Sequence, residues 1–132
     1  MDEIIDELRE ANQPVPIPLE LPDDEDLIAV EEAILLPLSR EFKQFLLTVS
    51  DVVTGSIEPV TASDPSSHTY LPEVTARAWD MGVPRHYIPI CEFNGQYYCV
   101  THEEQVVLWD GDETGAHWDS IWDWAQDVWL AG

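Results

Sequence analysis

The chain has 132 residues, which suits one domain, and 45% of them are hydrophobic. Asp and Glu number 27 against 5 Lys and Arg, so the formal net charge is -22 at pH 7. This charge argues against direct contact with nucleic acid or anionic membranes, because proteins bind both through Lys and Arg. It attracts basic protein surfaces, but solubility alone explains it equally well. A basic protein partner is therefore one of two expectations that the composition leaves open.

The sequence indicates a cytoplasmic protein. No apolar run approaches the ~20 residues that span a bilayer. Residues 1–10 are acidic and lack the basic and then apolar layout of a signal peptide. Cys91 and Cys99 are too few for a disulfide scaffold, so the chain must fold around an ordinary apolar core.

The first 22 residues predict a short helix and then an extended segment. Residues 2–11 place apolar side chains on one face at helical spacing. From Pro14 to Pro22, prolines alternate with apolar residues, a pattern that forbids helix and favours an extended path. We expect this segment to pack on the domain, as a linker or as an edge strand.

Three further helices are predicted between residues 23 and 82. Asp23 or Asp24 caps the first, Ser39 caps the second, and Pro72 opens the third, which Gly82 stops. Their inward residues are expected to be Leu27, Val30 and Ile34; Phe42, Phe45, Leu46 and Val49; and Val74, Ala78 and Met81. Between the second and third helices, residues 55–61 predict a strand and residues 61–69 a polar loop.

The clearest local signal is the Asn94-Gly95 pair between two apolar runs, residues 88–93 and 96–101. Such a pair predicts a hairpin, because a type I′ turn needs two positive φ angles. Residues 106–109 then extend the hairpin into an antiparallel meander.

The hairpin register also predicts the fate of the two cysteines. A two-residue turn places Cys91 opposite Tyr98 and Ile90 opposite Cys99. The two thiols then point to opposite faces of the sheet and cannot pair with each other. Neither lies in a helix-start or CxxC context that would lower its pKa, so both are expected to be small buried hydrophobes.

A last helix is predicted from about His117 to Leu130. Its apolar face is expected to hold Trp118, Ile121, Trp122, Ala125, Val128 and Trp129, with Asp119, Asp123 and Asp127 on the other side. Trp124 falls off the apolar face and is expected to be partly exposed. The tryptophans leave open a homodimer through this helix.

No motif in the sequence predicts catalysis, a metal or a cofactor. Asp110, Asp112, Thr114 and Gly115 match the start of a calcium loop, but Ile121 stands where the bidentate Glu is needed. We interpret this stretch as a turn. The four histidines have no metal-ligand spacing, and no serine lies in a nucleophile elbow.

The order of the segments resembles the SUKH superfamily, which includes the fungal Smi-one/Knr-four cell-wall regulators and many bacterial homologues. The resemblance covers roughly residues 27–130 and depends on the order of the segments "LLPLSREFKQFL", "YIPICEFNGQYYCV", "QVVLWDGD" and "SIWDWAQDVW". Ser50-Asp51 stands where the family usually has Asn-Gly. The resemblance implies one SUKH-like α+β domain over residues 1–132, with an antiparallel sheet, N-terminal helices and an aromatic C-terminal helix.

The resemblance also implies a binding role. Many bacterial members look like immunity proteins that neutralise toxins, often nucleases, and a nuclease surface is basic because it holds a polyanion. We therefore expect a non-enzymatic protein that neutralises a basic toxin. A regulatory or scaffold module is the alternative, and a hydrolase with a carboxylate or metal site ranks last. The expected binding residues are Asp64, His68, Asp110, Asp112, Glu113, Asp119, Asp123 and Trp124.

Overall fold

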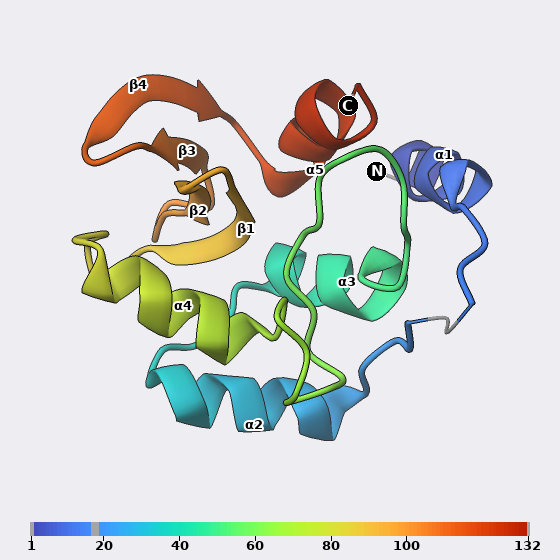
Figure 1. Ribbon diagram of the computed structural model, residues 1–132, viewed down its shortest axis with the longest axis horizontal. Coiled ribbons are helices and arrows are strands. Elements are labelled where there is room, and N and C mark those ends of the chain that lie inside the picture. The colour runs from blue at the N-terminus through green and yellow to red at the C-terminus, as the bar shows by residue number, and fades with distance from the viewer. Residues whose placement is uncertain (1, 17–18, 132) are drawn as a thin grey trace.

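The structure is a computed structural model that describes residues 2–16 and 19–131. Within these residues, a four-stranded antiparallel sheet of order β1-β2-β3-β4 lies to one side of the helices, with α4 packed along β1 and β4 at the outer edge, which confirms the predicted α+β class (Figure 1). The elements are α1 Asp2–Ala11, α2 Asp24–Ile34, α3 Arg40–Val49, α4 Leu71–Asp80, β1 Ile88–Phe93, β2 Gln96–Val100, β3 Val106–Trp109, β4 Glu113–Trp118, α5 Ile121–Trp124 and the π-helix η1 Ala125–Trp129. None of these helices has the length and apolar character needed to cross a membrane.

Local capping sets the starts of α2 and α3 as the sequence predicts. The Asp23 carboxylate accepts from the Asp26 amide at 2.9 Å, and the Asp26 carboxylate accepts from the Asp23 amide at 3.0 Å. Ser39 Oγ accepts from the Phe42 amide at 3.2 Å. These bonds satisfy amides that have no partner within the helix, and the predicted inward faces of both helices are buried.

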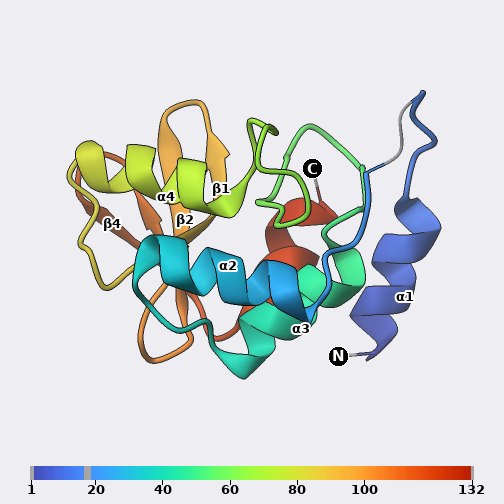
Figure 2. The same ribbon diagram turned by 90° about the horizontal axis from the view of Figure 1, so that it is seen from below.

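Helix α1 lies at the end of the molecule opposite the β3–β4 hairpin (Figures 1 and 2). Leu8 of α1 is fully buried, and the Gln13 amide donates to the Val53 carbonyl at 2.7 Å. The described part of the proline-rich segment forms no strand, although Pro22 is buried. Ile17 and Pro18, which belong to this predicted segment, lie outside the described residues.

The meander follows the predicted register with one irregularity. Phe93 lies opposite Gln96, and Cys91 lies opposite Tyr98. A bulge between Pro89 and Cys91 then places Pro89 opposite Cys99, where the uninterrupted register expected Ile90. Both cysteines are free and buried.

One predicted strand does not form, and one predicted helix ends earlier than expected. Residues 55–61 form only two isolated bridges, from Pro59 to Cys91 and from Thr61 to Tyr70, since proline has no amide hydrogen for a strand ladder. Met81, predicted to point inward, is 59% exposed because α4 ends one residue earlier.

The predicted C-terminal helix starts later than expected. Residues 113–118 form β4 instead, and Trp118 pairs with Val106 of β3. The turn at Gly111 sends the chain back along β3, so these residues gain strand hydrogen bonds before any helix begins. Ser120 Oγ accepts from the Asp123 amide at 3.0 Å and so caps α5.

The densest part of the core is an aromatic cluster between α3 and the C-terminal helix. The ring centroid of Phe45 lies 5.7 Å from Trp122, 6.4 Å from Trp124 and 5.6 Å from Trp129. Trp124 is fully buried, which contradicts its predicted exposure. The reason is the π-helix: residues five apart become neighbours along it, as the bond from the Leu130 amide to the Ala125 carbonyl shows. Trp124 and Trp129 can therefore face the same core.

Candidate functional site

The predicted binding residues do not form one surface. Trp124 lies in the core and is not available to a partner. Asp110 and Asp112 lie in the β3–β4 turn and Glu113 begins β4, whereas Asp119 follows the end of this strand. The two groups are therefore separated by the length of the strand, roughly 20 Å at about 3.3 Å per residue.

The carboxylates of the β3–β4 turn contact neighbours on the sheet. Gln96 Nε2 donates to Asp110 Oδ2 at 3.1 Å, and the Tyr87 hydroxyl donates to Glu113 Oε1. The bond to Glu113, together with partial burial, raises the pKa of Tyr87 to about 12. The side chains at this turn are exposed, and Glu113 borders a hollow of about 280 Å³ whose other walls come mainly from β3 and β4.

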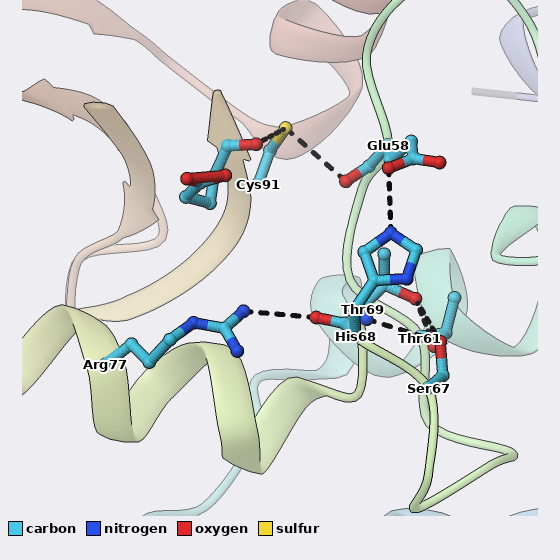
Figure 3. Close-up of polar contacts among 8 residues, drawn as sticks. Glu58, Thr61, Ser67, His68, Thr69, Arg77 and Cys91 are labelled. Atoms are coloured by element: carbon cyan, nitrogen blue, oxygen red, sulfur yellow. Dashed lines mark hydrogen bonds and ion pairs between the residues drawn. The ribbon is translucent and has the colours of Figure 1, made fainter. Parts of the chain in front are cut away.

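Asp64 and His68 lie on the loop of residues 61–69, beside the outer edge of β1 and thus across the sheet from β4 (Figure 3). His68 Nε2 lies 2.9 Å from Glu58 Oε2, and Arg77 Nη2 donates to the His68 carbonyl at 3.1 Å. Asp64 accepts from the hydroxyl and the amide of Ser66, bonds that lower the pKa of Asp64. These contacts order the loop and engage its charges within the chain.

The cysteine nearest this loop has the environment of a core residue. Cys91 Sγ lies 3.7 Å from the Glu58 carbonyl and 3.6 Å from the Glu92 carbonyl (Figure 3). Burial raises the pKa of Cys91 to about 12, and burial does the same for Cys99. His68 contacts the Glu58 carboxylate, so the thiol and the imidazole do not form a nucleophile–base pair. The described residues also bring no three metal-ligating side chains together.

The end of the sheet beyond Trp118 carries acids from three separate elements. Glu41 of α3 accepts from the Ile121 amide through Oε1 at 3.0 Å. Burial raises the pKa of Glu41; the Ile121 bond opposes this effect, and the charges of Glu104 and Asp123 add to it. We call Glu41, Glu104 and Asp123 the acidic cluster. Asp123 is the one member that the sequence had predicted.

Topology explains why these acids meet. Val106 at the start of β3 pairs with Trp118 at the end of β4, so the β2–β3 turn and the start of α5 share one end of the sheet. Glu41 joins them because its carboxylate holds the first amide of α5. More than 60 residues separate Glu41 from Glu104 in the chain. Sequence reasoning missed both because no local pattern marks such a contact.

The acidic cluster has no basic partner among the described residues. Of the five basic side chains, four are engaged elsewhere in the chain. Arg9 pairs with Asp51, Lys43 lies 3.8 Å from Glu31, Arg77 bonds the His68 carbonyl, and Arg85 lies 5.4 Å from the Trp79 ring centroid. The fifth, Arg40, directly precedes Glu41 in the chain, is exposed and forms no ion pair with a described carboxylate. The cluster therefore has no paired counter-ion among the described residues.

A cavity with mainly apolar walls opens beside this cluster. Its volume is about 420 Å³, and its walls come mainly from the α2–α3 connection and the β2–β3 turn. Phe42, Ile88 and Val100 contribute buried apolar side chains to it, and Glu104 belongs to both the cavity and the acidic cluster. We call this cavity the groove.

The sequence profile of the SMI1-KNR4 cell-wall family (SUKH_5) matches residues 1–130. The chain belongs to this family. The match extends the resemblance seen in the sequence to the N-terminal helix and the proline-rich segment. Among solved structures, a protein from Pseudomonas syringae pv. tomato is 57% identical and matches with a TM-score of 0.98, covering 100% of both chains. A search of curated proteins found no significant match.

Proposed function

We propose that this SMI1-KNR4 family protein is a non-catalytic binding protein of the immunity type. It neutralises a basic toxin, such as a nuclease, by covering the surface that the toxin uses for its polyanionic substrate. The observation that carries the proposal is the acidic cluster, in which three elements bring carboxylates together without a basic partner among the described residues. Such a surface leaves its negative charge free for a partner.

Electrostatics favours this kind of partner. The net charge of -22 attracts a basic surface over a distance of about one Debye length and speeds encounter. A nuclease exposes Lys and Arg because its substrate is bound through its phosphates. An acidic protein that occupies this surface excludes the substrate by charge and by volume.

The chemistry of the described side chains supports binding over hydrolysis. The buried thiols of Cys91 and Cys99 are strongly disfavoured as thiolates, since burial raises the pKa of each. His68 and Glu58 are both exposed and lie on a loop instead of in the groove. Among the described residues, the imidazole hydrogen bond is the one from His68 to Glu58, and none joins a histidine ring to a serine, threonine or cysteine.

The proposal is tested by deleting the gene from its native cell and growing the mutant with its parent. We expect the parent to kill or outcompete the mutant, and wild-type protein supplied from a plasmid to restore survival. A mutant that competes as well as the parent, under conditions in which the parent attacks other cells, would contradict the proposal.

A regulatory or scaffold role is the second candidate, because the description of the matching family refers to the cell wall. A pull-down with tagged protein at low and high salt separates the two. A basic toxic protein released by salt supports neutralisation. A cell-envelope or regulatory protein, captured from a strain whose deletion mutant survives co-culture, supports the scaffold role.

A further inference from the structure

We propose that the groove is the docking site for a basic segment of the partner, with one large apolar side chain in the groove and Lys or Arg side chains on the acidic cluster. This inference rests on the proposed function and names the surface and the partner chemistry that the function requires. The groove accounts for the apolar anchor, and the cluster beside it accounts for the positive charge.

The groove can hold a large side chain. Its volume of about 420 Å³ falls within the roughly 300–1,000 Å³ typical of ligand pockets. The walls come from the α2–α3 connection, from α3 and from the ends of β1 and β2. Phe42, Ile88 and Val100 belong to the rigid core, so the groove exists before a partner arrives. A preformed apolar hollow suits the buried aromatic or aliphatic anchor that dominates many protein interfaces.

The polar groups of the groove favour a cation over a neutral polar ligand. Ser39 Oγ already accepts from the Phe42 amide, and Thr101 Oγ1 accepts from the Glu103 amide at 3.2 Å. The groups that remain are the Glu104 carboxylate and two imidazoles, His86 and His102, whose centroids lie 5.7 Å apart. A carboxylate beside aromatic rings suits a guanidinium or ammonium group with an apolar stem.

The apolar surface continues outside the groove. Leu36 and Pro37 line both the groove and a shallow hollow on α2, where Ile28 and Leu35 are 53% and 85% exposed. Glu31 and Glu32 lie in the same hollow. Lys43, the basic residue at this edge, is paired with Glu31. Apolar side chains flanked by acids complement a segment in which apolar and basic residues are mixed.

Backbone strain is concentrated at the same place. Three described non-glycine residues have a positive φ: Leu35 at 60°, Asn94 at 52° and Glu104 at 65°. Asn94 suits its hairpin turn, but Leu35 and Glu104 stand where glycine would relieve strain. Both flank the groove. The Leu35 backbone caps α2, since its amide donates to the Glu31 carbonyl at 2.9 Å, but a glycine could do the same without strain. The exposed Leu35 side chain is therefore free for contact with a partner.

The test uses defined peptides and the full chain. The probe is the acetylated peptide amide Lys-Arg-Leu-Trp-Arg-Lys, followed by backbone NMR titration at low and high salt. Two controls separate its features: Lys-Arg-Gly-Ser-Arg-Lys lacks the apolar anchor, and Glu-Asp-Leu-Trp-Asp-Glu reverses the charge. We expect saturable shifts at the amides of Leu36, Leu38, Thr101 and Glu104 with the probe, and binding at least about tenfold weaker with either control.

Two variants and two matched controls complete the test. Leu35→Gly should raise the stability of the free protein, because it relieves a positive φ, and should weaken the probe at least about threefold. Met81→Gly removes another exposed apolar side chain, at the end of α4, and should leave probe binding unchanged. Glu104→Lys should weaken the probe about tenfold, whereas Asp110→Lys in the β3–β4 turn should weaken it less than twofold.

Several results would overturn the inference. Shifts confined to residues 110–113, equal binding of the peptide without an anchor, or no saturable shift at all would each exclude the groove as the docking site. These results are independent of the survival experiment, because no toxin is present. If the probe binds but the deletion mutant survives beside its parent, the groove remains a docking site and neutralisation is refuted. If the probe does not bind but the mutant is killed, neutralisation stands and the toxin binds another surface.

Discussion

The two ends of the sheet carry similar negative charge but differ in the apolar structure next to the carboxylates. At the β3–β4 turn, Asp110, Asp112 and Glu113 stand on an exposed hairpin whose strand β4 is solvated along most of its length. At the other end, Glu41 and Asp123 lie over the aromatic cluster, beside a cavity with apolar walls. An acidic surface becomes a candidate site where it borders an apolar hollow.

This contrast shows why charge alone could not locate the site. Exposed charges are well hydrated, and single contacts between them contribute about 0–1 kcal/mol. An apolar anchor adds desolvation and shape, which supply affinity and exclude other partners. The acids of the β3–β4 turn can steer a basic partner, while those beside the groove can hold it.

The largest effect should follow from removing the aromatic support of the groove end. Trp124→Ala deletes a fully buried indole that packs on Phe45 and Tyr98. We expect it to lower the free energy of unfolding by about 3–5 kcal/mol. His117→Ala, at an exposed position of β4 whose side chain forms no hydrogen bond with described residues, should change it by less than about 0.5 kcal/mol. Denaturant unfolding followed by circular dichroism measures both free energies of unfolding. Equal losses in the two variants would contradict the difference in support between the two ends of the sheet.

The two thiols probe the core between the two ends. Because burial raises the pKa of Cys91 and of Cys99 from 9.0 to about 12, the native protein should react with a thiol reagent roughly a thousand-fold more slowly than the unfolded chain. Colorimetric labelling with and without denaturant measures the rates. Rapid labelling of one thiol in the native state would show that the sheet is open there.

A smaller effect is expected at the hairpin end, where Tyr87 donates to Glu113. This bond and partial burial raise the pKa of Tyr87 to about 12, so its stabilising effect is complete below about pH 10 and is lost as the pH rises towards 12. Glu113→Gln should move the titration towards lower pH in ultraviolet absorbance. Tyr87→Phe identifies which part of the absorbance change belongs to Tyr87. An unchanged titration in Glu113→Gln would show that the bond to Glu113 does not raise the pKa of Tyr87.

The smallest effect should appear at Glu41. Its pKa is raised by burial and by the charges of Glu104 and Asp123, so its ionisation opposes folding. Stability should therefore be highest below the unfolded pKa near 4.5 and should fall as the pH rises through the folded value. Glu41→Gln keeps an acceptor for the Ile121 amide and should reduce this fall. Asp110→Asn is the control, and thermal unfolding at a series of pH values is the measurement. A steeper fall of stability with pH in Glu41→Gln than in the wild type would contradict the raised pKa of Glu41.

Local chemistry predicted much of the fold, and contacts distant in the chain account for what it missed. Asn94-Gly95 and the cap at Ser39 act over a few residues, and both were correct. The burial of Trp124 depends on a π-helix, which has no signal in a pattern of period 3.6. The acidic cluster depends on strand pairing that brings Glu104 near Glu41, and no sequence spacing contains that information.

The central claim is that the groove end of the sheet, and not the hairpin end, holds a basic partner. The most direct measurement is survival of the deletion mutant beside its parent when it carries one of two doubly charge-reversed proteins, Glu104→Lys with Asp123→Lys or Asp110→Lys with Asp112→Lys. Both change the net charge equally, and circular dichroism verifies that both fold. The account predicts that the first pair fails to protect and the second protects; protection by the first pair, or failure of the second alone, would contradict it.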